Sequence, residues 1–418
     1  MKPSKLFNRN FVLLFQGQLI SNIGSASYGL ALLFWLKQAT GSATIMGLFA
    51  MCSMVPALVL GPLGGTLADH YSRKKIMIYG DVANGLMIIG VACLMLFFPE
   101  RVELTVTMLF VSSVLNGVVM SIFRPAVGAM LPDLVPANRL MLANGLLQNS
   151  AMITMAVGQF LGGLLFRVLG APILLLVNGI SYLLSALSEC FIEAPQQVVN
   201  EHLHWRELMK KFTNDTLEGF RFVQSQAGLK ALIFMFALTT FFMAPMGVLL
   251  PFFVEDSLGV SVDWFGFMMA GMASGMLVGS LIAGIVPLKS HRRGPVVAFG
   301  FVLISLLYGS LSFSETPVFC LSILGIMGLI QGCIGVFVTA AIQLNTPSRI
   351  RGRVLGVMST LTLAMAPVSL GIAGVAVDLL DKNIGIIFLA CGAGMFLLSP
   401  LFIVSKDFHR FLAVKTTP

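Results

Sequence analysis

The chain of 418 residues is poor in charge: Asp, Glu, Lys and Arg make up 11% of it, while 57% of its residues are hydrophobic. It has three Trp and five His, but 42 Gly. A mean hydropathy of +0.92 excludes an ordinary water-soluble domain. Abundant glycine in such a chain is typical of helices that pack closely in lipid.

The sequence also lacks the residue patterns of common enzymes. It has no Gly-rich loop ending in Lys-Ser or Lys-Thr, so it contains no nucleotide-driven energy source. Paired carboxylates, a Ser/His/Asp set and a metal-ligand cluster are missing from any plausible site, and we expect neither an enzyme nor a bound cofactor or metal. The six cysteines are far apart within apolar segments, which predicts no disulfide: Cys52, Cys93, Cys190, Cys320, Cys333 and Cys391.

Long apolar segments are what the sequence has instead. About 20 apolar residues span a bilayer as a helix, and only helices or closed barrels satisfy their backbone groups there. Twelve segments qualify: 11–36, 43–68, 76–98, 104–130, 140–166, 171–192, 229–254, 262–287, 295–313, 317–343, 354–379 and 384–404. The sequence therefore predicts an all-α integral membrane protein with twelve transmembrane helices in two six-helix halves.

A polar stretch divides the twelve segments six and six. Residues 194–228 have aromatic residues at roughly helical spacing among charged ones, which predicts an amphipathic cytoplasmic connector on the membrane surface. We expect an N-terminal half at 1–193 and a C-terminal half with a short cytoplasmic tail at 229–418. Arg73-Lys74 and Arg292-Arg293 follow the second segment of each half, as expected for duplicated transporter halves.

Basic residues orient the helices. All but four of the 26 Lys and Arg residues fall in segments on the same side as Met1; the exceptions are Lys37, Arg101, Arg167 and Lys382. The positive-inside rule then places both termini in the cytoplasm. The net charge of +8 fits loops near anionic lipid and predicts no nucleic-acid partner. The first apolar segment is too long for a cleaved signal peptide, and 402–418 is too short for an added soluble domain.

Residues 65–75, GTLADHYSRKK, place one acid and three bases between the second and third segments. This stretch resembles the G-x-L-x-D-x-x-G-R-K loop of the major facilitator superfamily, with Ser72 in place of the second Gly. The resemblance implies that Asp69 caps the eleventh helix near Gly352 and gives Arg73 an acidic partner, for which Asp81 is the nearest candidate. The alternative is that the bases only set topology, which we favour for Lys75. The predicted gating set is Gly65, Asp69, Arg73, Lys74, Asp81, Gly352 and Arg353.

A second motif lies in the fifth segment. Gly158, Gly162 and Gly163 resemble the family's antiporter motif G-P-x-x-G-G, with Gln159 in place of Pro. The alternative is close helix packing alone, which the stripe Gly271, Gly275 and Gly279 also predicts. Three further stretches resemble the macrolide-efflux branch, drug:proton antiporter family 3: 15–21 (FQGQLIS), 125–136 and 353–367.

The centres of the substrate-lining helices have amides where proton carriers usually have acids. Only Asp81, Glu189 and Asp378 approach the spans, each near an end. Proton coupling is thus implied by the resemblance; Asp81 is the candidate carrier, with partnership to Arg73 as the alternative. We expect a substrate cavity among amides, some of which instead bond between helices: Gln18, Asn22, Asn116, Asn144, Gln148, Asn149 and Gln331.

Together with these features, the resemblance implies a secondary transporter of a bacterial cytoplasmic (inner) membrane that exports amphipathic, drug-like or macrolide-like small molecules by alternating access. Its partners would be the small-molecule substrate, protons as coupling ion and membrane lipids, and it would act as a monomer. Two alternatives remain. One is a dedicated siderophore or lysophospholipid exporter or flippase of the same fold, and the other is a membrane sensor or scaffold that transports nothing.

Overall fold

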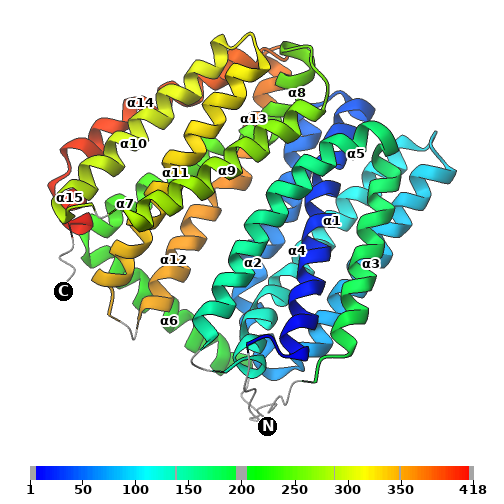
Figure 1. Cartoon of the computed structure of the whole chain (residues 1–418), viewed down its shortest axis with the longest axis horizontal. Coiled ribbons are helices and arrows are strands. Elements are labelled where there is room, and N and C mark those ends of the chain that lie inside the picture. Colours follow the sequence, from blue (N-terminus) through cyan, green and yellow to red (C-terminus); the bar gives the residue numbers. More distant parts are fainter. Residues whose placement is uncertain (1–5, 137–138, 194–204, 287, 348–349, 414–418) are drawn as a thin grey trace. The chain divides into compact units, whose positions relative to one another are not determined.

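The computed structural model describes residues 6–136, 139–193, 205–286, 288–347 and 350–413 (Figure 1). Side chains of some helical residues within these ranges also lie outside the description. The chain divides into two compact units, Met1–Leu203 and His204–Pro418, and each is treated by itself.

The first unit is a bundle of long helices. Its elements are α1 (Arg9–Thr40), α2 (Ala43–His70), α3 (Arg73–Phe97), α4 (Val102–Leu134) and α5 (Leu140–Cys190). α5 packs against both α1 and α3, while α4 packs against α2 and α3. The sequence of capping residues explains where these helices begin: the side chains of Asn8, Ser42 and Ser72 each accept a hydrogen bond from a backbone amide in the first turn.

α5 consists of two membrane helices that are separated by a sharp bend. Gly170 interrupts it with φ 72° and ψ 171°, a backbone conformation that glycine adopts without steric cost, and Pro172 follows. A second positive-φ glycine, Gly41, closes α1 with its amide donating to the Lys37 carbonyl. The predicted gap between segments 140–166 and 171–192 therefore corresponds to a bend at one residue.

The second unit contains shorter helices and more breaks. Its elements are α6 (Trp205–Ser225), α7 (Ala227–Met243), α8 (Met246–Phe252), a π-helical turn (Phe253–Ser257), α9 (Asp263–Ile285), α10 (Ser290–Ser310), a 3₁₀ turn (Leu311–Phe313), α11 (Pro317–Asn345), α12 (Arg351–Leu363), α13 (Met365–Leu379), α14 (Ile384–Val404) and α15 (Lys406–Leu412). α9 lies beside α11 and α10 beside α14, while α15 packs on α7 and α10 (Figure 1).

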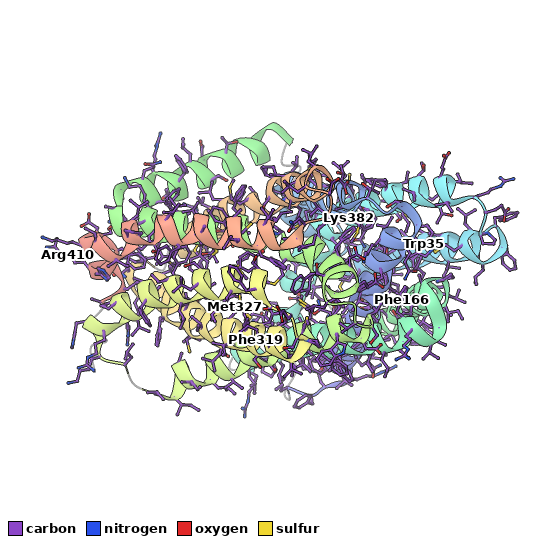
Figure 2. The ribbon with its side chains drawn as sticks, turned by 90° about the horizontal axis from the view of Figure 1, so that it is seen from above. Trp35, Phe166, Phe319, Met327, Lys382 and Arg410 are labelled. Atoms are coloured by element: carbon purple, nitrogen blue, oxygen red, sulfur yellow. The ribbon has the colours of Figure 1, made fainter. Side chains whose placement is uncertain are left out.

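Two spans of this unit are each made of two helices. Ala244-Pro245 separates α7 from α8, and Ala364 separates α12 from α13. Within α13, the Ser369 hydroxyl donates a hydrogen bond to the Phe241 carbonyl of α7. Near the end of α13, Lys382 (labelled in Figure 2) lies 5.7 Å from the ring centroid of Phe252.

Within the described ranges, eleven stretches are long and apolar enough to cross a membrane. One of them, Leu142–Cys190, contains the bend at Gly170 and is long enough for two spans, so the predicted twelve helices in two sets are confirmed. Large apolar side chains cover the outer faces: Phe97, Val168 and Ile285 are each more than 70% exposed. Helices that are apolar both inside and outside the bundle are typical of lipid-embedded proteins.

Candidate functional site

The basic stretch 65–75 is mostly helical. α2 continues to His70, and only Tyr71 and Ser72 separate it from α3. Ser72 begins α3 by accepting a hydrogen bond from the Lys75 amide at 3.4 Å. The surroundings of Gly65, Gly352 and the Asp69 side chain lie outside the description. The predicted capping of the eleventh helix by Asp69 therefore stays a prediction.

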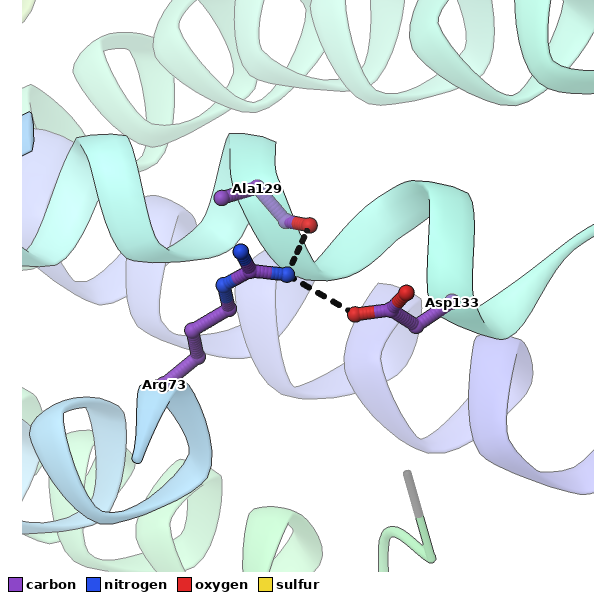
Figure 3. Close-up of polar contacts among 3 residues, drawn as sticks. All are labelled: Arg73, Ala129 and Asp133. Atoms are coloured by element: carbon purple, nitrogen blue, oxygen red, sulfur yellow. Dashed lines mark hydrogen bonds and ion pairs between the residues drawn. The ribbon is translucent and has the colours of Figure 1, made fainter. Parts of the chain in front are cut away.

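Arg73 fastens the start of α3 to the end of α4. One guanidinium nitrogen donates to the Ala129 carbonyl and to the Asp133 carboxylate, both at 2.8 Å (Figure 3). Ala129 and Asp133 are one turn apart on α4, so they present both acceptors on the same face. The identification of Asp81 as the acidic partner of Arg73 is therefore wrong; the partner is Asp133.

The two lysines after Arg73 differ from each other. The Lys74 ammonium donates to the Cys190 carbonyl at 2.7 Å, which ties α3 to the last residue of α5. A lysine is suited to this contact because free helix-end carbonyls carry partial negative charge. Lys75 is exposed, as a residue that only sets topology would be.

Asp81 lies two turns into α3 and is almost fully buried, with 1% of its surface exposed. α5 packs against this part of α3 and contributes Glu189, which is also 1% exposed and interacts electrostatically with Asp81. The structure thus brings together two of the acids that the sequence places near span ends.

The glycines of the fifth segment lie where α5 meets α1. A Cβ atom at Gly158 would lie 2.5 Å from the Ala26 Cβ, and one at Gly162 would lie 2.9 Å from the Ser27 Cα. The Ser27 hydroxyl donates to the Gly158 carbonyl at 2.9 Å. Neighbouring Gly163 is buried as well. Small residues are required here for the two backbones to approach.

The predicted cavity amides are spread over different environments. Asn144, Gln148 and Asn149 are exposed on α5, and the Asn144 side chain donates back to the Leu140 carbonyl at 3.0 Å. Gln18, Asn22, Asn116 and Gln331 are half-buried.

A polar cluster between α1 and α5 was missed by the sequence reasoning. Ser25 Oγ lies 3.0 Å from Tyr182 Oη and 3.5 Å from the Asn178 side-chain oxygen. Asn116 of α4 lies beside the same Tyr182 side chain. The sequence of α1 does contain a signal for this cluster, because Ser21 and Ser25 are four residues apart and lie on one helical face. Gly17 and Gly24 lie against Ser185 and Ser181 of α5.

In the second unit, α6 packs against the start of α12. Glu218 of α6 forms an ion pair with Arg353 of α12. The next residue, Gly219, lies so close that a Cβ atom there would be 3.0 Å from the Arg353 carbonyl oxygen. The predicted gating residue Arg353 is therefore held by the helix that lies in the predicted connector.

This contact gives a first prediction. Replacing Glu218 by glutamine removes the charge that faces Arg353, and partly exposed ion pairs contribute up to about 1 kcal/mol. Amide hydrogen exchange in α6 should therefore become up to roughly fivefold faster. The matched control is Arg221→Gln, which removes a charge from an exposed position of the same helix. Equal exchange in wild type and Glu218→Gln would show that the ion pair does not hold α6.

Twelve membrane helices in two six-helix sets define a polytopic integral membrane protein. The chain belongs to the Major Facilitator Superfamily, whose family model matches residues 14–370. It is therefore a membrane-embedded transporter, and a small-molecule substrate follows from the family.

Two of the proteins that the chain resembles in sequence are named as efflux proteins. The chain is 26% identical over 375 residues to macrolide efflux protein A of Streptococcus pyogenes, covering 89% of this chain and 90% of that protein. It is 26% identical over 351 residues to the multidrug efflux pump Tap of Mycobacterium tuberculosis, covering 82% of this chain and 81% of that pump. Among solved structures it resembles the nucleoside transporter NupG, with a TM-score of 0.74 at 12% identity over 95% of this chain and 99% of that one. This last likeness shows the fold alone.

Proposed function

We propose that the protein exports amphipathic, drug-like small molecules across a bacterial cytoplasmic membrane by alternating access, driven by proton entry. The observation that supports this most is the match to two efflux proteins along 89% and 82% of the chain, across both halves. Residues 1–193 and 229–418 form the two halves that rock about the substrate, and 194–228 connect them in the cytoplasm. The protein works as a monomer surrounded by lipid, with both termini in the cytoplasm.

The substrate binds among neutral polar groups. Amides offer donors and acceptors without the desolvation cost of a charge, which suits uncharged parts of varied amphipathic molecules. The proposed contacts are Gln18, Asn22, Asn116, Asn144, Gln148, Asn149 and Gln331. The many Met and Phe residues of the chain, 25 and 33, supply adaptable apolar surface.

The gate is built on the 65–75 stretch. Asp69 stabilises the closed state by facing the amino-terminal end of α12, where the helix dipole favours a negative charge. Gly65 and Gly352 permit close approach of the two backbones. Arg73 and Lys74 hold α3 to α4 and α5, so that α3 and its neighbours move as one body.

The test is transport by purified protein in proteoliposomes, with several amphipathic cargos, with and without an imposed pH gradient. Accumulation of more than one cargo that increases with the gradient supports the proposal. Transport confined to one siderophore or lysophospholipid would replace it with a dedicated exporter, and no transport of any cargo would overturn it.

The gate is tested by Asp69→Ala. Coupling between sites in proteins is typically 1–3 kcal/mol, so export should fall at least about fivefold. Lys75→Ala, which removes an exposed charge from the same stretch, is the control and should transport as wild type does. Unchanged export by Asp69→Ala would remove Asp69 from the gate.

A further inference from the structure

α3 and the second part of α5 run in opposite directions and cross at glycine. A Cβ atom at Gly85 would lie 2.9 Å from the Gly179 carbonyl oxygen, and one at Gly179 would lie 3.0 Å from that of Gly85. Glycine at both positions lets the two backbones approach this closely. It fixes which residues face each other one and two turns further along the two helices.

Asp81 lies one turn from this crossing on α3, beside Ser185 of α5. Glu189 follows Ser185 by one turn on the same face of α5 and interacts electrostatically with Asp81. Ser185 is fully buried, and both acids are 1% exposed. None of the described residues meets hydrogen-bond geometry to the four carboxyl oxygens; the Ser185 hydroxyl approaches Asp81 and has no geometric partner of its own.

Two ionised carboxylates cannot persist in this interface. A buried charge costs several kcal/mol unless it is paired and hydrogen-bonded, and two like charges add their repulsion to that cost. Neutralising one group with a proton removes the repulsion and supplies a donor for the other. We propose that Asp81 and Glu189 are a proton-binding carboxyl pair, which holds one proton between α3 and α5 and exchanges it with water at the Lys74 end of these helices.

The charged and polar groups on the helices next to Asp81 and Glu189 are compatible with a carboxyl pair that carries one negative charge. Lys74 lies near Glu189, because its ammonium donates to the carbonyl of the adjacent Cys190. Arg73 is engaged by Asp133, so its charge is directed to α4. α1 contributes the neutral Gln16, which donates to the Ser188 hydroxyl, and the Leu13 carbonyl, which accepts from that hydroxyl. The other titratable or charged groups of the described residues around the pair include Lys75, Tyr79, Arg124 and Tyr182, with Arg9, Cys190 and Glu193 toward the end of α5.

The consequence for transport rests on the proposed function. With the proton bound, α3 and α5 pack as described. When it leaves to water as H⁺, two carboxylates face each other beside one lysine, and the resulting repulsion favours a different packing of these helices. Binding and release of the proton would therefore bias two arrangements of the first unit, as coupling to a proton gradient requires.

Proton binding itself is tested without any cargo. Infrared difference spectra of the full-length protein in nanodiscs are recorded between acidic and alkaline pH, with inspection of the carboxylic-acid C=O stretch. Wild type should show a band that is lost at alkaline pH, and Asp81→Asn/Glu189→Gln should lack it. Glu193→Gln, which changes an exposed acid just beyond α5, should keep it.

Coupling is tested in the same proteoliposomes as export. In Asp81→Asn/Glu189→Gln the rate with an imposed pH gradient should fall to the rate without one, whereas Glu193→Gln should keep the stimulation. If the double variant is not monodisperse on size exclusion, Glu189→Gln alone is used, and it should shift the C=O band because the remaining acid has a new neighbour.

The outcomes separate this inference from the proposed function. Gradient-driven export that is intact in the double variant overturns the inference and leaves export standing. A titrating band without transport of any cargo supports the pair as a proton site and overturns the proposed function. An unchanged band in the double variant, or one that responds to sodium at fixed pH instead of to protons, overturns the pair.

Discussion

Replacing Gly279 by leucine should abolish the yield of folded protein. A Cβ atom at Gly279 would lie 1.9 Å from the Leu329 carbonyl oxygen, and the backbone of α11 cannot yield as a flexible side chain would. The same closeness repeats along the interface: a Cβ atom at Gly275 would lie 2.1 Å from the Gly325 oxygen, and one at Gly332 would lie 2.1 Å from the Met276 oxygen. α9 and α11 are therefore in backbone contact over several turns (Figure 1).

Overpacking of a well-packed site usually costs 1–3 kcal/mol, and a branched side chain against a backbone carbonyl belongs at or above the upper end, about 3 kcal/mol. The measurement is the amount of monodisperse protein on size exclusion, together with the thermal transition. Gly284→Leu on the same helix is the control, because no atom lies within 4 Å of a Cβ there. Equal yields of Gly279→Leu and Gly284→Leu would contradict this packing.

The spans were predictable because the bilayer fixes their length. Twelve segments of about 20 apolar residues give twelve helices whatever their partners are. The sequence even located the bend at Gly170, since the predicted segments end at 166 and resume at 171. Hydropathy does not predict how far a helix continues beyond its apolar segment.

The partner of Arg73 was missed for this reason. Hydropathy ends the fourth segment at 130, which leaves Asp133 in a loop. α4 in fact continues to Leu134, which is buried, although Pro132 lies within its last turn. Ala129 and Asp133 then share a face of one helix, and a spacing of four residues becomes the acceptor pair for one guanidinium.

The carboxyl pair was half predictable. The sequence places Asp81 and Glu189 near span ends, but it cannot say that α3 packs on the second part of α5 rather than on another helix. That pairing comes from the long-range crossing at Gly85 and Gly179, two glycines with no local motif around them. Contacts within one helix can be read from spacing, whereas contacts between helices depend on tertiary packing.

Charged residues at the helix ends of the first unit thus do more than set topology. Arg73 binds α4, Lys74 binds α5, and between them α3 is attached to both neighbours at one end. If both were ionised, Asp81 and Glu189 would repel each other and weaken the attachment of α3 to α5. Arg73 and Lys74, at the start of α3, strengthen the attachment of α3 to its neighbours. This arrangement predicts that loss of Arg73 acts on the movement of α3 and not only on stability.

Arg73→Ala should lower export about tenfold or more, since a hydrogen bond to a charged group contributes roughly 1.5–3 kcal/mol and this guanidinium makes two contacts. Asp133→Ala should have a similar effect, and the double variant should be no worse than either single variant, because the two residues act as one unit. Arg73→Lys keeps the charge but loses the planar guanidinium, so it should recover only part of the rate.

The measurement is the initial rate of export in proteoliposomes, normalised to monodisperse protein so that lost folding is not counted as lost transport. Lys75→Ala, two residues from Arg73 and exposed, is the matched control for charge. Additive losses in Arg73→Ala/Asp133→Ala would mean that the two side chains serve different steps. The Arg73–Asp133 contact in Figure 3 would then follow from the closeness of two opposite charges and would not couple the movement of α3 to that of α4.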